Sequence, residues 1–209
     1  MKLRNVTPDT SLDARLASLI GPQAGAFSLA QARALGFQDH HIRYRAESGR
    51  WVRGLPRTFV LAGCPDSPTQ RMQLAQLWGG EASVVSRWTA AWVLGLSPAG
   101  ETVDISLPVR REAPARWVRV HRCHLEVCDV EQIHGVRITN ATRTLIDLAR
   151  DMEEVPLAIM MEEALRRGQT SIPRLRWRLE RVRTGHAGCG LLKRIVEERL
   201  PGGLSESAL

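Results

Sequence analysis

The sequence lacks several features that would assign it to a common class. Its four cysteines, Cys64, Cys123, Cys128 and Cys189, form no CxxC pair. No apolar run approaches the roughly 18 residues that a transmembrane helix needs, and the N-terminus has no apolar signal core. There is no GxxxxGK[ST] phosphate loop and no recognisable Ser-His-Asp spacing. We therefore expect reduced thiols, a cytoplasmic location, no membrane contact and no cofactor.

Lysine is also scarce: Lys2 and Lys193 are the only two in the sequence. Arginine therefore supplies nearly all of the positive charge behind the net charge of +7. A GC-rich genome explains an arginine-rich total but not its distribution. Residues 1–62 hold nine Lys/Arg against four Asp/Glu, residues 63–157 hold ten against twelve, and residues 158–209 hold ten against six. A basic N-terminal part fits a polyanionic partner.

The N-terminal part reads as three helices. Residues 10–20 place leucines and Ile20 on one helical face. Ser28 and Gln31 form a capping box that begins a second helix over residues 28–35, which Gly36 ends. Asp39 is placed to cap a third helix that runs to about Ser48. The second and third helices are thus joined by four residues that include a glycine, as in a helix-turn-helix.

Two β-prone runs follow the third helix, on either side of residues 54–57, and predict a hairpin. Three helices and a hairpin are the order of a winged helix-turn-helix. Further along, residues 102–109 alternate apolar and polar side chains, which predicts a half-buried strand. Residues 116–123 and 136–139 predict two more strands, and residues 84–96 predict a short strand that runs into a helix ended by Gly95. Helices are expected at residues 69–78, 140–150, 155–167, 172–183 and 189–199.

The predicted fold class is α+β. A winged helix-turn-helix domain at residues 1–62 precedes a mixed α+β domain with a small sheet and a C-terminal helical region at 63–200. Residues 201–209 are expected to be a linker or the truncated start of a nuclease-like domain.

The third helix carries the candidate DNA contacts. On a 3.6-residue period Ile42 and Ala46 face inward and Tyr44 faces outward. In a recognition helix the outer face contacts the base edges of DNA and the flanks contact its phosphates. Arg43 and Arg45 lie on the two flanks, and their guanidinium groups suit phosphate geometry. The alternative is a solvated helix whose arginines cover apolar surface. The predicted DNA-binding residues are Ser28, Gln31, His40, His41, Arg43, Tyr44, Arg45, Ser48, Arg50, Arg53 and Arg57.

Two stretches resemble the AbiEi-type antitoxins, transcriptional regulators of type IV toxin–antitoxin systems. SLAQARALGF with RAESGRWVRGLPRTFVLAG resembles their winged-helix domain, and VVSRWTAAWVLGL with ITNATRTLIDLA resembles their second domain. Arg87 stands where that family usually has a histidine, and Trp88 departs from its pattern as well. In the second motif Arg143 and Asp147 can pair at i,i+4 on the helix surface.

The resemblance implies autoregulatory, sequence-specific binding of double-stranded DNA and antitoxin activity toward a nucleotidyltransferase-type toxin. Repressors with winged helices often bind inverted repeats as dimers or paired monomers, so a homodimer on DNA is a further expectation. Relatives of this kind continue into a nuclease domain similar to very-short-patch-repair endonucleases. PGGLSESAL matches the opening of that domain, with Glu206 at its first glutamate. One glutamate cannot hold a catalytic divalent metal, so we expect no enzyme activity. The alternative is the DNA-targeting part of such an endonuclease.

Three other groups of residues could suggest a metal site, a nucleophile or a second binding surface. His121, Cys123, His124, Cys128 and His134 match no common zinc spacing, so we expect no metal site. Cys189 lies near a helix start, where the dipole would lower its pKa, but no base accompanies it. Arg174, Arg178 and Arg181 share one helical face, which predicts a solvated basic surface or a second nucleic-acid contact, with Trp177 placed to stack on an arginine or a base.

Overall fold

The computed structural model describes residues 10–182 and 188–199 of the chain. Its N-terminal part follows the order helix, strand, two helices, two strands. These elements are α1 (Thr10–Ile20), β1 (Ala26–Ser28), α2 (Leu29–Ala34), α3 (Asp39–Glu47), β2 (Trp51–Arg53) and β3 (Thr58–Leu61).

The three predicted helices and the hairpin are confirmed, and the capping box is present. The Ser28 hydroxyl accepts a hydrogen bond from the Gln31 N–H at 3.1 Å, and the Gln31 side chain accepts one from the Ser28 N–H at 2.9 Å. Gly36 follows α2 with a φ of 105°, in the range that glycine tolerates.

The predicted cap of α3 is wrong. Gln38 is the N-cap and makes no side-chain cap, whereas Asp39 is the first helical residue. The Asp39 carboxylate instead accepts two hydrogen bonds from Arg33 of α2. A carboxylate in the first turn still interacts favourably with the helix dipole.

The hairpin belongs to a three-stranded antiparallel sheet with the order β1-β3-β2. Strand β1 was not predicted, because three residues are too few to display alternation. A small aromatic core covers this sheet: Phe27 meets Trp51 edge-on at 4.8 Å between ring centroids, and Phe37 meets Trp51 at 5.1 Å. Leu16, Ile20 and Ile42 close this core from the helices.

The rest of the chain forms a five-stranded sheet with helices around it. The sheet order is β6-β5-β4-β8-β7, with β4–β8 and β5–β6 parallel. A 3-10 turn (Val127–Asp129) precedes β7. The elements are α4 (Pro68–Gly79), β4 (Val84–Val85), α5 (Arg87–Val93), β5 (Val103–Leu107), β6 (Val118–Arg122), β7 (Val130–Ile133), β8 (Val136–Thr139), α6 (Ala141–Leu148), α7 (Glu154–Arg166), α8 (Ile172–Arg181) and α9 (Cys189–Glu198).

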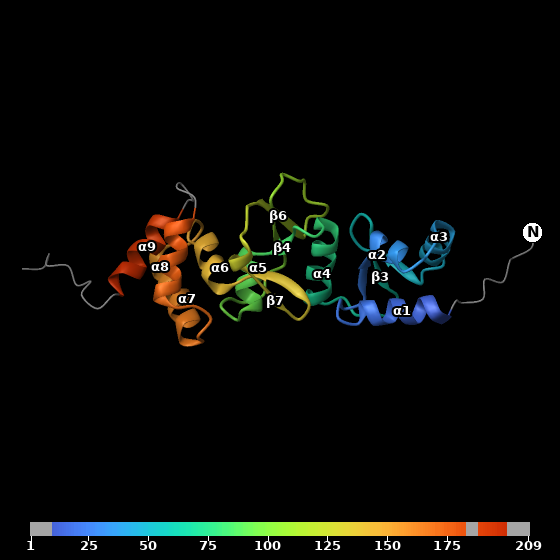
Figure 1. Ribbon diagram of the computed structural model, residues 1–209, viewed down its shortest axis with the longest axis horizontal. Coiled ribbons are helices and arrows are strands. Elements are labelled where there is room, and N and C mark those ends of the chain that lie inside the picture. Colours follow the sequence, from blue (N-terminus) through green and yellow to red (C-terminus); the bar gives the residue numbers. More distant parts are fainter. Residues whose placement is uncertain (1–9, 183–187, 200–209) are drawn as a thin grey trace, which may run out of the picture.

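In Figure 1 the molecule is elongated. Helices α1–α3 lie at one end, α7–α9 at the other, and α4 and the five-stranded sheet lie between them. No helix among the described residues is long and apolar enough to cross a bilayer.

Strand β5, which lies between β6 and β4, differs from its prediction. All five of its residues are buried, including Asp104 and Ser106, because α4 and α5 both pack against it. The polar side chains are satisfied inside the protein: Asp104 meets His121 Nε2 at 2.7 Å, and Ser106 donates to the Ser86 hydroxyl at 2.9 Å. Strand β7, which pairs with β8, was also not predicted.

The two parts share one hydrophobic cluster. Leu55, in the loop of the β2–β3 hairpin, is 5% exposed and belongs to the cluster that contains Leu74 and Trp78 of α4. Ala26 and Val60 of the three-stranded sheet join it. The hairpin loop is therefore fixed on α4.

Leu55→Ala should lower the free energy of unfolding by about 2–4 kcal/mol, because it leaves a cavity against α4. Urea unfolding followed by circular dichroism measures this change. Val52→Ala in the same hairpin is the control, since Val52 is 52% exposed and should change stability by less than about 0.5 kcal/mol. Equal effects of the two substitutions would contradict the packing of the loop on α4.

Candidate nucleic-acid interface

Helix α3 presents one apolar and one polar face. Ile42 is 6% exposed and packs in the aromatic core, and Ala46 is half-buried beside it. Tyr44, nearly opposite, is 50% exposed. The predicted orientation of the helix is confirmed.

The outer face of α3 gathers polar and cationic groups. His40, Arg43, Glu47 and Ser48 are exposed there, whereas His41 is half-buried. The rings of His40 and His41 contact each other, with centroids 4.0 Å apart. This face offers hydrogen-bond donors and acceptors from several side chains, and no element of the described part of the chain covers them.

Arg45 does not extend from this face. Its guanidinium donates to both carboxylate oxygens of Asp13 in α1, at 2.5 and 3.2 Å. It also lies 4.9 Å from the Phe37 ring centroid and 5.4 Å from that of Trp51. Only 13% of this side chain is exposed, so Arg45 anchors α3 to α1 and is not available as the shoulder residue that the helical angles predicted.

Ser28 and Gln31 are also engaged within the protein. Their side chains complete the capping box, and the Gln31 amide donates to Gln23 Oε1 at 2.9 Å. Their predicted position at the start of α2 is correct. The side-chain atoms that would contact DNA, however, are hydrogen-bonded within the protein.

The hairpin contributes three exposed arginines, which are Arg50, Arg53 and Arg57. Arg53 lies over the Phe59 ring at 6.0 Å. Arg57 has a φ of 63°, a left-handed conformation that the turn after Pro56 requires. The structure thus brings exposed arginines of the hairpin and the outer face of α3 into the same N-terminal part of the molecule.

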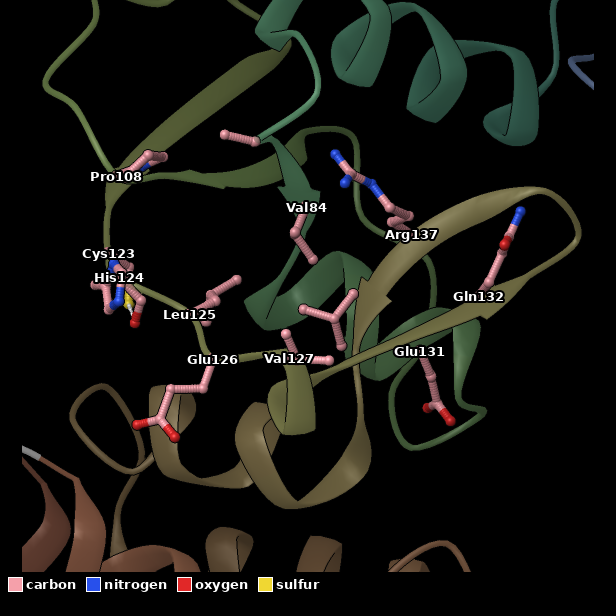
Figure 2. Close-up of a pocket in the computed structure, with 12 residues that line it drawn as sticks. Val84, Pro108, Cys123, His124, Leu125, Glu126, Val127, Glu131, Gln132 and Arg137 are labelled. Atoms are coloured by element: carbon pink, nitrogen blue, oxygen red, sulfur yellow. Dashed lines mark hydrogen bonds between the residues drawn. The ribbon is translucent and has the colours of Figure 1, made fainter.

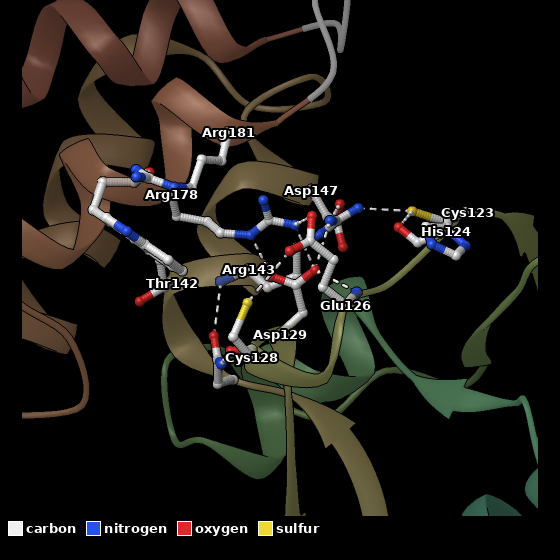
Figure 3. A network of polar contacts seen from close by, with 12 residues as sticks. Cys123, His124, Glu126, Cys128, Asp129, Thr142, Arg143, Asp147, Arg178 and Arg181 are labelled. Carbon is white, nitrogen blue, oxygen red and sulfur yellow. Dashed lines mark hydrogen bonds and ion pairs between the residues drawn. The ribbon is translucent and has the colours of Figure 1, made fainter.

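A second polar cluster lies between α6, α8 and the turn before β7 (Figure 3). Asp129 accepts two hydrogen bonds from Arg178, at 2.6 and 2.7 Å, and one from Arg143 at 3.1 Å. Arg143 also donates to Asp147 at 2.9 Å. All four side chains are at most 4% exposed, so this is a buried ion network.

The network corrects two predictions. Arg143 and Asp147 do pair at i,i+4, but in the interior and not on the helix surface. Arg178 is buried and is no part of a solvated basic face. Arg181 does stack on Trp177 at 4.8 Å, as expected. Asp129 had no sequence signal, because it lies in a 3-10 turn without periodicity.

The network also sets the ionisation of Asp129. Burial alone would raise its pKa, but the hydrogen bonds from Arg178 and the Glu126 N–H, together with the charge of Arg143, hold the pKa below its ordinary value. The Asp129 hydrogen bonds raise the pKa of Arg178. At neutral pH the ionised pair therefore ties α8 to the sheet.

The cysteine and histidine side chains have separate surroundings. Cys123 Sγ accepts a hydrogen bond from Arg143 Nη2 at 2.7 Å, whereas His121 contacts Asp104. Within the described part of the chain, no three His, Cys, Asp or Glu side chains are arranged to hold a metal ion. Burial raises the pKa of the Cys189 thiol, so the expected lowering by the helix dipole is wrong.

The second of the two stretches that resemble the family contributes buried and paired residues to the second part of the fold. Arg87, where the family has a histidine, begins α5 and contacts Asp151. The helix that contains Arg143 is buried along its whole length. Glu206 lies outside the described residues.

Comparisons with known proteins add a likeness in fold. No protein-family model matches the sequence, and no curated protein matches it significantly. Among solved structures, the chain is similar to the crystal structure of the RV2827C protein from Mycobacterium tuberculosis, with a TM-score of 0.58 and 15% sequence identity. The match covers 94% of this chain and 78% of that one. At this identity the likeness concerns the α+β fold alone.

Asp129→Asn should lower the free energy of unfolding at pH 7 by about 3–5 kcal/mol, because it removes the buried carboxylate that two buried guanidiniums share. Arg143 then keeps Asp147 as its carboxylate partner, and Arg178 keeps Glu126. The folded pKa of Asp129 is lowered, so its contribution is present above about pH 4 and is lost as the pH falls through the folded pKa. Urea unfolding at pH 7 and pH 3 should therefore show a smaller difference between variant and wild type at pH 3. A difference that grows on acidification would contradict this role.

Proposed function

We propose that this protein binds double-stranded DNA through α3, with β2 and β3 as the wing of a winged helix-turn-helix. The observation that carries the proposal is the outer face of α3. Tyr44 is half exposed there beside Arg43 and His40, while Ile42 and the Arg45–Asp13 ion pair fix the helix from below. A recognition helix needs both an uncovered polar face and a rigid base.

The chemistry of the exposed groups divides them into two roles. Arg43 and the hairpin residues Arg50, Arg53 and Arg57 carry guanidinium groups suited to phosphates. Tyr44 and His40 offer hydrogen-bonding atoms and ring faces for base edges. Arg45, Ser28 and Gln31 contribute by positioning α2 and α3, because their own polar atoms are engaged in the protein.

The biological role in this proposal is that of a non-enzymatic transcriptional regulator in the cytoplasm that represses its own operon. The resemblance to AbiEi-type antitoxins extends the proposal to a nucleotidyltransferase-type toxin as partner. A toxin would have to contact other surfaces than the Thr139–Ala149 motif, because that motif is buried.

Arg43→Ala should weaken binding to specific and random duplexes alike, because a phosphate contact is independent of sequence. It should also reduce the slope of log K against log salt concentration by about one unit. Fluorescence anisotropy with the upstream DNA of the gene and a scrambled duplex, at two salt concentrations, measures both. Arg15→Ala is the matched control, since Arg15 is an exposed arginine of α1. Identical losses in both variants would refute a specific contact by Arg43.

Tyr44→Ala should instead reduce the preference for the upstream DNA over the scrambled duplex, by about 1–3 kcal/mol, because base contacts carry the discrimination. The salt dependence should stay the same. Competition titrations at constant salt measure the ratio of the two affinities. If the substitution weakens both duplexes equally, Tyr44 does not read bases.

A further inference from the structure

A cavity of about 580 Å³ lies at the seam between the N-terminal part and the five-stranded sheet. Its walls come from both sides of the seam. Arg57 belongs to the hairpin, Gln73 and Trp78 to α4, and Arg111 and Arg137 to the sheet and its loops. Such a volume lies in the range of small-molecule sites.

The lining is polar and positively charged. Five glutamines and three arginines line the cavity together with one acidic residue, Glu81. Three arginines and one glutamate give these lining residues a formal charge of +2. The lining therefore favours an anion that can also accept hydrogen bonds.

Three of the five lining glutamines donate hydrogen bonds from their amides within the protein. Those of Gln23 and Gln76 donate to backbone carbonyls, and Gln31 donates to Gln23. Gln73 is different, because it is 3% exposed and its Nε2 has no hydrogen-bond partner among the described residues. Gln73 lines the cavity, but its Nε2 atom is itself buried, so it reaches an acceptor in the cavity only after a shift of the side chain. A buried amide without a partner costs about 1–3 kcal/mol, which favours that shift when an acceptor binds.

Two arginines are held in place by their surroundings. The Arg111 guanidinium lies 3.9 Å above the Trp78 ring and donates to the Trp78 carbonyl at 2.9 Å. Arg137 donates to the Ser83 carbonyl at 2.8 Å. Figure 2 draws a neighbouring pocket, which shares Gln132 and Arg137 with the seam cavity, and shows these two side chains pointing toward the side where α4 lies. Both guanidiniums keep further N–H groups for an anion.

We propose that this seam cavity binds the phosphate group of a small phosphate monoester of the nucleoside monophosphate class. A phosphate monoester carries a charge of about −1.5 to −2 at neutral pH, which matches the +2 of the lining, whereas a phosphodiester of DNA carries one negative charge. The cavity exceeds the size of a phosphate, so the organic part of the ligand lies against the glutamines. The ligand contacts both sides of the seam and joins them.

The test is calorimetric titration of the full chain with inorganic phosphate and with adenosine 5′-monophosphate. The wild type should bind both, the nucleotide more tightly. Arg111→Met should weaken both affinities about tenfold or more, because it removes a fixed guanidinium. Arg110→Met is the matched control, since it removes the neighbouring arginine, which does not line the cavity, and should change neither affinity.

Gln73→Leu should also weaken phosphate binding, by removing the unpartnered amide. Circular dichroism checks that this variant folds, because Gln73 is buried. If it does not fold, the Arg111→Met variant still tests the proposal, because Arg111 is exposed and its substitution should leave the fold intact. Absence of phosphate and nucleotide binding in the wild type, or equal binding by the Arg110 and Arg111 variants, would overturn the proposal.

A third titration, with a scrambled duplex, separates the two sources of phosphate. If Arg111→Met weakens duplex binding and leaves the affinity for adenosine 5′-monophosphate unchanged, Arg111 contacts the DNA backbone and the small-ligand proposal is wrong. The titration with adenosine 5′-monophosphate does not depend on DNA binding. It therefore stands even if Arg43→Ala leaves the affinity for DNA unchanged.

Discussion

Helix α4 has to bury its surface against two sheets at once. It packs against β1 and β3 of the N-terminal part and against β4, β5 and β8 of the second part. Six of its residues are buried, including Gln70 and Gln73, so it lacks the single apolar stripe of a surface helix. The hairpin loop, the shared hydrophobic cluster and the cavity at the seam all depend on this packing.

Arginine serves three different purposes in this chain. Arg143 and Arg178 form part of the interior, where the carboxylates of Asp129 and Asp147 compensate their charge. Arg45 and Arg111 lie against aromatic rings and hold elements together. Arg43 and Arg53 extend from the surface. A high arginine count therefore says little about DNA binding until the partners of each guanidinium are known.

The proposed role of α3 as a recognition helix rests on the separation of its anchoring groups from its exposed groups. A contact face must be uncovered, yet its atoms must be held in one position to discriminate between ligands. Ile42 and the Arg45–Asp13 pair supply the rigidity, and Tyr44 lies on the uncovered side. In the seam cavity, the stacking of Arg111 on Trp78 provides comparable positioning for an anion site.

The sequence by itself determined the local structure: the bounds of α1, the capping box at Ser28, the hairpin and the outward direction of Tyr44 follow from periodicity and hydrogen-bonding rules that act within a few residues. Strand β1 was missed because it has only three residues, and β7 because its two central residues, Glu131 and Gln132, are both polar and break the alternation. Strand β5 was predicted to be half-buried because its own alternation does not reveal how many helices cover it. Only the tertiary structure decided that Arg45 meets Asp13 and Arg178 meets Asp129, since these partners lie 32 and 49 residues apart. Long-range pairing depends on how helices pack, and a helical pattern specifies which face is polar but not what that face will contact.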